Sequence, residues 1–416
     1  PLPPIMRSVD PNPTQSEPPA VGEQGAAGAF GEPRTPGSVA ALGLVALALA
    51  GAAALLVVLT RYEYGLDQGI YAVVGDTMLS GGAPYKDAWD FKPPGVFFAY
   101  AASRGFGDGM EAVRILEAGL WASLVGAFAL LGRRFAAGFA PGGLAGALAV
   151  SSYVWLGFWH TGQPEGFGAV ALVWALWCAT SEVGPEVPRL RLRWAVAGAL
   201  YCVAALMKPP LGGGFLVSLG FAVYASRRAG LGVWPPLLSF AAGGLVVLGS
   251  LGVYIAAKGA GPDLYGALFV YTPEYTRLTH AEGHLAGKLA RAVATLFARF
   301  SWLHPVGLAL FVLLPKAAPR EREFALHVGC IVLLLLFGVA LQGQFFAYHY
   351  GATLPLVALL AGFGLWKLTK LGERFALGTL AVALLVFGLA NANGLRGANP
   401  SGFVERVQRV DTGRAH

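Results

Sequence analysis

The stretch from Val39 to Thr60 contains 22 residues without a single charge. As a helix rising 1.5 Å per residue it would be about 33 Å long, and the hydrocarbon core of a bilayer is about 30 Å thick. Similar apolar segments recur along the chain. Only 13% of the residues are charged and the mean hydropathy is +0.59, against roughly 25% charged residues in a soluble domain. We therefore predict an all-α integral membrane protein.

The apolar segments predict one polytopic transmembrane domain over residues 39–392, a bundle of about eleven helices. Residues 1–38 are rich in Pro, Gly, Ala and Glu and lack apolar periodicity, so we predict a disordered tail there. Residues 393–416 are predicted to be a short C-terminal tail. The segments predicted to span the membrane, or nearly so, are 39–60, 112–131, 135–158, 165–181, 194–207, 210–226, 233–257, 303–315, 325–342, 348–366 and 375–391.

Basic residues cluster at every second connection between these segments. The positive-inside rule places those connections, and with them the N-terminal tail, in the cytoplasm. The formal charge of +7 therefore reflects topology and does not indicate binding to nucleic acid. The clusters are Arg133–Arg134, Arg189/Arg191/Arg193, Arg227–Arg228, Lys316/Arg320/Arg322 and Lys367/Lys370/Arg374.

The other connections then face outward, and they hold nearly all the polar residues suited to chemistry. The two long ones are a first outer loop, 61–111, and a later outer loop, 258–302, both predicted to carry short amphipathic helices. The polar side chains in all these connections are Asp67, Asp87, Asp90, Lys92, His160, Gln163, Glu165, Lys208, His280, His284, Gln344, His349 and Tyr350. Their gathering on one side predicts a functional site at the outer boundary of the membrane.

Asp67 follows the first apolar run by seven residues and has two interpretations. Asp is a favoured N-cap, and the segment from Gln68 onward could begin a helix. Alternatively, a carboxylate at the membrane surface could accept a proton from an attacking hydroxyl group.

Lys92 precedes two prolines, Pro93 and Pro94, which fix the backbone and remove two N–H donors. A cation on such a rigid turn could bind a phosphate group, or it could form a salt bridge to Asp87 or Asp90 that shapes the loop. Lys208 precedes two prolines in the same way at the outward end of another segment. It is therefore a second candidate contact for phosphate.

The segment from His160 to Glu165 reads as a tight outward turn that leads into a helix. Pro164 suits the first helical turn, and Glu165 would interact favourably with the helix dipole. His160 and Gln163 could bind sugar hydroxyl groups.

Gln344, His349 and Tyr350 open a late helix from the outside. Tyr and His at an interface are often only membrane anchors, but these three residues would lie where a headgroup enters. Arg114 and Glu117, one turn apart in a predicted span, are most simply a local ion pair.

His280 and His284 have i, i+4 spacing, which could hold a metal on a helix, although no third ligand lies near them in the sequence. The three cysteines stand in apolar runs without metal-ligand spacing, so we expect buried free thiols. The sequence contains no glycine-rich phosphate-binding loop and no dinucleotide fingerprint. Any sugar donor is therefore expected to be borne on a lipid.

The residues of the first outer loop resemble those of the polyprenyl-phosphate-dependent glycosyltransferases of the GT-C fold. Bacterial members include aminoarabinose-to-lipid A transferases and mannosyl-, galacturonosyl- and arabinosyltransferase-like proteins. The resembling residues are Asp67-Gln68, Tyr71, Met78-Leu79, Gly82, Pro84-Tyr85, Asp87, Asp90, Lys92-Pro93-Pro94, Arg114, Gly162-Gln163-Pro164-Glu165, Lys208-Pro209, Tyr348-His349-Tyr350 and Leu354-Pro355.

The resemblance implies inverting transfer of a sugar from a polyprenyl phosphate to an envelope glycan, lipid or protein on the extracytoplasmic face of the bacterial cytoplasmic membrane. Asp67 would act as base or position the acceptor, and Lys92 would contact the lipid phosphate. Many members have an acidic residue directly after the aspartate, whereas this chain has Gln68. A second acid would then come from Asp87, Asp90 or Glu165. Binding of a divalent metal is left as an open alternative.

The alternative function is a transporter or flippase of lipid-linked sugars. Transporters place ionisable or broken-helix sites near the bilayer midplane, often in repeated halves. The sequence contains neither a charge pair at the midplane nor a clear internal repeat, and its polar groups gather on one side. These features favour the enzyme.

Overall fold

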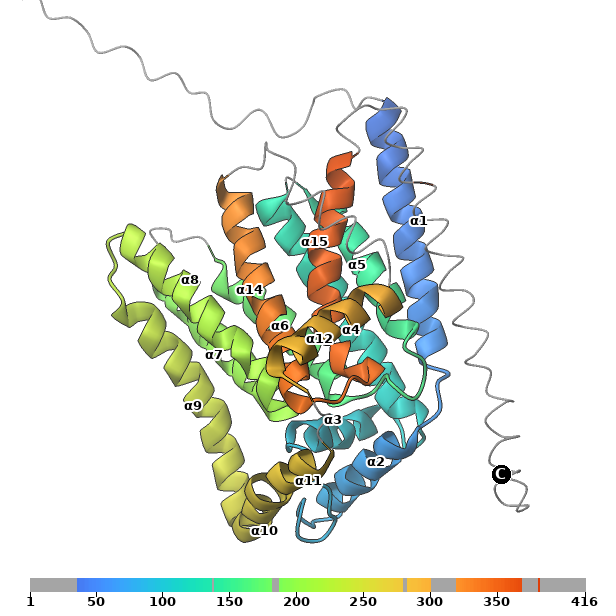
Figure 1. Cartoon of the computed structure of the whole chain (residues 1–416), viewed down its shortest axis with the longest axis vertical. Helices are drawn as coiled ribbons and strands as arrows, with labels where there is room; N and C mark the ends of the chain where they lie inside the picture. Colours follow the sequence, from blue (N-terminus) through green and yellow to red (C-terminus); the bar gives the residue numbers. More distant parts are fainter. Residues whose placement is uncertain are drawn as a thin grey trace, which may run out of the picture.

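The computed structural model describes residues 36–136, 138–181, 187–279, 283–300 and 319–368, together with residue 381. Within these ranges the chain is helical, and its long helices form a bundle (Figure 1). They are α1 (Pro36–Leu59), α4 (Glu111–Phe135), α5 (Phe139–Val154), α6 (Pro164–Ala179), α7 (Val187–Met207), α8 (Gly214–Arg228), α9 (Trp234–Ala257), α14 (Pro319–Gln342) and α15 (Thr353–Leu368). Each coincides with a predicted apolar segment, whereas segments 303–315 and 375–391 lie outside the described residues.

Five of the described helices are long and apolar enough to cross a membrane: α1, α4, α7, α9 and α14. Helices α5, α6 and α15 are apolar but shorter. This architecture confirms the prediction of an all-α membrane protein.

Glycine allows several of these helices to approach backbone to backbone. A Cβ atom at Gly243 of α9 would overlap the carbonyl oxygen of Ala195 in α7, and one at Gly198 of α7 would overlap that of Phe240 in α9. Gly142 of α5 packs in the same way on the backbone of Phe128 in α4. Lipid gives no hydrophobic drive for helix association, so such close packing contributes much of the stability.

Both outer loops contain the short helices that the sequence predicts. The first holds α2 (Leu66–Leu79), α3 (Gly95–Ser103) and the 3₁₀ turn η1 (Arg104–Phe106). The second holds α10 (Gly261–Tyr265), the π-helical turn η3 (Gly266–Tyr271), α11 (Thr272–Thr279) and α12 (Leu285–Phe300). Helices α2, α3, α10 and α11 cover the lower end of the bundle in Figure 1, while α12 crosses it in front.

Aromatic side chains fasten the two outer loops to each other. The ring of Trp89 meets that of Tyr271 edge-on at 4.9 Å between centroids, and Phe91 lies 4.7 Å from Tyr275. The Oγ1 of Thr272 also donates to the carbonyl of Phe91 at 3.2 Å. The two loops that were predicted to carry the site are therefore one packed layer.

The expectation for the cysteines is only partly correct. Cys178 is buried, Cys202 is half-buried and Cys330 is exposed on the surface of the bundle. An apolar helix in a membrane has lipid-facing as well as buried positions, so an apolar run alone does not imply burial.

Candidate functional site

Asp67 lies in the first turn of α2, but it is not the N-cap of that helix. Gly65 occupies the N-cap position and no side chain caps the helix, which begins at Leu66. The cap interpretation is therefore wrong, because the helix starts two residues earlier than that interpretation required. The carboxylate of Asp67 is partly exposed.

Gln163 connects Asp67 to the turn that precedes α6. Its Nε2 donates to Oδ2 of Asp67 at 3.3 Å, and its Oε1 accepts from the hydroxyl of Tyr71 at 3.2 Å. Tyr71 and Gln163 are both buried. The amide thus orients the carboxylate, whereas the prediction gave Gln163 a contact with sugar. Pro164 occupies the start of α6, as predicted.

Gln68 is fully buried, and its amide fixes α2 to the same turn. Its Nε2 donates to the carbonyl oxygens of Phe158 at 2.9 Å and Thr161 at 2.7 Å, and lies 3.3 Å from that of Trp159. A carboxylate at this position has no proton to donate and would repel these oxygens. The departure from the acidic pair of many GT-C members thus has a structural reason here.

Arg114 and Glu117 form the predicted ion pair, with Nη1 and Oε2 2.9 Å apart and both side chains fully buried. The pair also forms hydrogen bonds with segments outside its own helix. The five guanidinium N–H groups all find acceptors, which are Tyr62 O, Glu63 O, Phe158 O, Thr161 Oγ1 and Glu117 Oε2. Glu117 Oε1 accepts from the Tyr153 hydroxyl and the Gly162 N–H. The pair therefore holds the turn at 157–163 against the start of the first outer loop.

Gly162 adopts φ +67°, in the left-handed region. A Cβ there would lie 2.8 Å from Nη1 of Arg114 and 3.0 Å from the hydroxyl of Tyr100, which itself donates to the Gly162 carbonyl at 2.9 Å. Both the conformation and the crowding require glycine.

The turn that carries Lys92 is rigid, as its prolines predict. Tyr85 has φ +69° and donates from its hydroxyl to the carbonyl of Lys92 at 2.9 Å. Gly95 then packs on the end of α7, where a Cβ would lie 2.7 Å from the carbonyl carbon of Leu206. This close contact brings the turn beside Lys208, which directly follows α7.

Lys92 has no salt bridge to Asp87 or Asp90 in the described part of the chain, so the loop-shaping alternative is wrong. Its ammonium lies 4.1 Å above the ring of Phe91. Asp87 instead accepts from the Ala83 N–H at 2.8 Å.

Asp90 is buried, and its Oδ1 accepts from the Phe91 N–H at 2.8 Å. Its Oδ2 has no hydrogen-bond partner among the described residues. Burial raises the pKa of this carboxyl, and the nearby charge of Lys92 opposes that shift.

Lys208 pairs with Glu165, with Nζ and Oε1 2.5 Å apart, and the side chains are only 18% and 2% exposed. Burial lowers the pKa of Lys208, and the charge of Glu165 opposes the shift. Glu165 Oε2 has no partner among the described residues. The ammonium of Lys208 also lies 5.7 Å from the ring centre of Tyr348.

The segment 344–350 supplies the last side chains of the cluster. His349 lies in the 3₁₀ turn η4 (Ala347–Tyr350), and its Nδ1 is 2.7 Å from the carbonyl oxygen of Gln344. Burial lowers the pKa of His349 well below its usual range, and the charges of Lys208, Lys92 and His160 contribute. The ring of His160 stands 5.8 Å from that of Tyr348, and Tyr350 is buried.

The structure thus brings together polar residues from five separate parts of the chain. Asp67, Lys92 and Glu165 all act electrostatically on Lys208, while Asp67, Asp90 and Glu165 all act on Tyr71. Asp87, by contrast, is held in its own loop.

A metal site finds no support in the described ranges, where no group of three or more His, Cys, Asp or Glu residues could hold an ion. His284 is exposed and His280 lies outside those ranges.

Sequence reasoning missed the positioning role of Tyr71 and Tyr100 and the buried His327 of α14. His327 is 2% exposed, and its Nε2 lies 2.7 Å from Oγ of Ser218. A lone histidine inside the apolar segment 325–342 was the available signal. Tyr71 and Tyr100 bond to residues about 60 to 90 positions away in the sequence. No local sequence pattern could therefore have predicted these contacts.

No family profile matches the chain, and no curated protein matches it either. Solved structures do match it. ArnT from Cupriavidus metallidurans bound to undecaprenyl phosphate superposes with a TM-score of 0.60 at 20% identity, over 84% of this chain and 64% of that one. The crystal structure of the same protein in the apo state superposes with a TM-score of 0.55 at 17% identity, over 87% of this chain and 74% of that one. ArnT is a GT-C glycosyltransferase. The chain therefore has the GT-C fold that the first-loop residues predict, and it spans about two thirds of ArnT's length.

Proposed function

We propose that this protein is an inverting membrane glycosyltransferase that takes a sugar from a polyprenyl-phosphate donor. The observation that carries the proposal is the cluster at the start of α6, where Gln163 contacts the partly exposed carboxylate of Asp67 at 3.3 Å and Glu165 contacts Lys208 at 2.5 Å. The packing of Gly95 on the end of α7 brings the turn of Lys92 to the same place. The likeness to ArnT, which was crystallised with undecaprenyl phosphate, supports a donor of that class.

In the proposed reaction an acceptor hydroxyl attacks the anomeric carbon of the sugar from the face opposite the phosphate. The new C–O bond forms as the C1–O bond to phosphate breaks, and both electrons of that bond leave with the phosphate. The carboxylate of Asp67 receives the hydroxyl proton. Gln163 would hold that carboxylate in one orientation through the 3.3 Å hydrogen bond.

Lys92 and Lys208 would stabilise the charge that develops on the leaving phosphate. A fixed cation does this better in the transition state than in the ground state, since the charge on the bridging oxygen grows as the bond breaks. Lys92 has no carboxylate partner within salt-bridge distance among the described residues, so it is the first candidate for the contact. Lys208 would act together with Glu165.

Asp90, His160, Gln344, His349 and Tyr350 are proposed to line the space for the sugar and the acceptor. An apolar groove of about 790 Å³ runs along α2, lined in part by Leu66, Ile70, Val73, Trp89 and Trp159, with Asp87 as the one carboxylate among its described lining residues. Such a lining suits a substrate with a hydrocarbon chain.

We place the site on the extracytoplasmic face of the bacterial cytoplasmic membrane, with an envelope glycan, lipid or protein as acceptor. The support is the basic clusters, which lie at the opposite ends of the helices from Asp67. Helices α4 and α8, for example, both end in an arginine pair at that far end.

Mass spectrometry of envelope glycans and glycolipids tests the proposal, in wild type, in a deletion strain and in the deletion complemented with Asp67→Asn. Asp263→Asn, an exposed aspartate of the later outer loop, is the matched control. Loss of one sugar mass in the deletion and in Asp67→Asn, with recovery in the control, is expected. Full recovery in Asp67→Asn would overturn the catalytic role and favour a flippase.

A further inference from the structure

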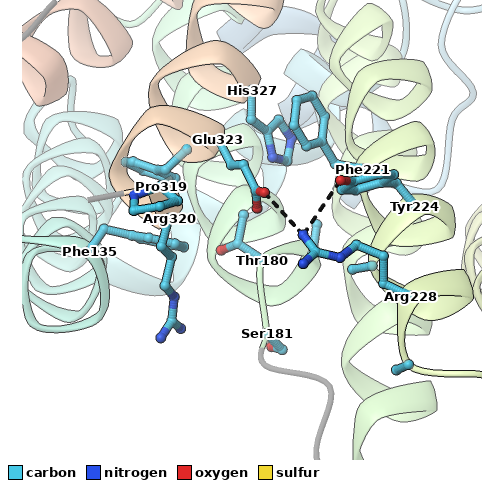
Figure 2. Close-up of a pocket in the computed structure, with 14 residues that line it drawn as sticks. Phe135, Thr180, Ser181, Phe221, Tyr224, Arg228, Pro319, Arg320, Glu323 and His327 are labelled. Atoms are coloured by element: carbon cyan, nitrogen blue, oxygen red, sulfur yellow. Dashed lines mark hydrogen bonds and ion pairs between the residues drawn. The ribbon is translucent and has the colours of Figure 1, made fainter. Parts of the chain in front are cut away.

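A second cavity lies at the end of the bundle away from Asp67. It has a volume of about 570 Å³ and opens between the ends of α4, α6 and α8 and the start of α14 (Figure 2). Helices α6 and α8 run from the candidate site to this cavity, and α14 runs back. No part of the proposed reaction uses it.

Aromatic side chains form much of its wall. Phe135 and Phe324 stack with ring centroids 4.1 Å apart, and Phe221 stacks on His327 at 4.4 Å. His327 already has a polar partner, since its Nε2 meets Ser218 and Ser218 meets the Tyr201 hydroxyl at 2.5 Å. This chain of three side chains ties α14, α8 and α7 together below the cavity. The wall is thus suited to apolar atoms.

The rim carries two arginines from different helices, Arg228 and Arg320, and one carboxylate, Glu323. Arg228 reaches Glu323 through a single contact of 3.3 Å, with side chains 64% and 48% exposed. Ion pairs so exposed are weak and readily exchanged. Figure 2 shows the guanidinium of Arg228 between Glu323 and Tyr224 at the mouth.

Three helix C-termini at the rim, those of α4, α6 and α8, would oppose an anion through their dipoles. Some of the carbonyls in these last turns already accept hydrogen bonds, which weakens this opposition. Ala136, Thr180 and Ala229 each donate a backbone N–H to the last turn of the preceding helix, and Arg134 donates to the Trp177 carbonyl at 2.7 Å. The start of α14, at Pro319, contributes the favourable end of a dipole.

We propose that this cavity binds the phosphate group of an anionic membrane lipid, independently of the glycosyl-transfer site. The phosphate accepts a hydrogen bond from Arg228, and Arg320, whose guanidinium lies 5.4 Å from the centre of the Phe135 ring, adds a second positive charge at the rim. The first methylene groups of the lipid pack on Phe221 and Phe324. The basic end of the bundle is where headgroups lie, so a lipid reaches the mouth without leaving its leaflet.

The test is lipid binding to the full-length protein in detergent micelles, followed by native mass spectrometry. Dioleoyl phosphatidylglycerol is titrated, with dioleoyl phosphatidylcholine as the zwitterionic comparison and inorganic phosphate as a competitor. Arg228→Ala/Arg320→Ala is expected to raise the dissociation constant for phosphatidylglycerol about 30-fold. Arg191→Ala removes an exposed charge at the same end outside the cavity, and should change it less than about twofold.

A second variant, Ala225→Trp, places an indole ring inside the cavity and leaves every charge in place, because Ala225 lines it on α8. It should also abolish retention of phosphatidylglycerol. The proposal would be overturned if Arg191→Ala weakened binding as much as the double arginine variant does. It would also be overturned if the protein retained phosphatidylcholine as well as phosphatidylglycerol, or if Ala225→Trp bound phosphatidylglycerol as the wild type does. Displacement of the lipid by inorganic phosphate at equal concentration would reassign the cavity to a free anion.

Discussion

The Nε2 of Gln163 lies 3.3 Å from Oδ2 of Asp67, although 96 residues separate the two along the chain. Gln163 stands at the start of α6 and Asp67 at the start of α2, so a side chain from the start of one helix orients a carboxylate at the start of another. Hydrogen bonds with Arg114, Glu117 and Gln68 hold the turn that precedes Gln163. A buried network thus fixes the one group proposed to move a proton.

Replacing Gln163 by methionine should slow turnover without weakening donor binding. The variant keeps the volume and loses the hydrogen bond that orients Asp67, and a misplaced catalytic group can cost up to about 100-fold. We expect kcat to fall roughly 10- to 100-fold with KM for the donor nearly constant. Tyr71→Phe, which removes the donor to Gln163 Oε1, should act in the same direction and less strongly. A rise in KM alone would assign Gln163 to substrate binding.

Breaking the Arg114–Glu117 pair should destabilise the protein strongly. Arg114→Met leaves the Glu117 carboxylate buried without its counter-charge, which costs about 3–5 kcal/mol in comparable pairs. Arg114→Met/Glu117→Met removes both charges and should cost less than the single variant. Thermal unfolding in detergent measures the difference. Equal melting temperatures for the single variant and wild type would show that the pair contributes little.

Lys92→Ala should weaken binding of a polyprenyl-phosphate donor analogue roughly 10- to 100-fold, the range for a hydrogen bond to a charged group. Lys86→Ala is the matched control, because Lys86 is an exposed lysine of the same loop. Binding titrations on purified protein measure both. Similar losses in the two variants would mean that only the overall charge of the loop matters.

Asp90→Asn should stabilise the protein more at pH 7 than at pH 4. Burial raises the pKa of Asp90 in the folded protein, so the native state binds its proton more tightly than the unfolded state. The wild type therefore loses stability as the pH rises through that pKa, and the neutral amide does not. Melting temperatures across pH 4 to 7 measure the gap. A constant gap would mean that Asp90 has an ordinary pKa.

The fold was predictable because lipid imposes it. Apolar segments of membrane-spanning length must become helices that satisfy their own backbone groups, and each described helix of the bundle matches such a segment. The rigid turn at Lys92 and the start of α6 at Pro164 were also predictable, since proline restricts the backbone locally.

The arrangement of the site was not predictable, because it depends on contacts between distant segments. Gln163 was predicted to bind sugar, yet it is buried and engaged by Tyr71 and Asp67. Lys208 was predicted as a second contact for phosphate, and its pairing with Glu165 at 2.5 Å was not predicted. The cavity at Arg228 and Arg320 has no local signature either, since its wall comes from four helices.

The sequence by itself determined that the chain enters a membrane, which segments become helices and which residue types gather at one boundary. Those properties follow from solvation and backbone geometry within short windows of sequence. Only the tertiary structure decided which amide orients Asp67, which lysine is paired and where a second cavity opens. These relationships depend on helix packing through residues such as Gly95, whose contact with α7 sets Lys92 beside Lys208.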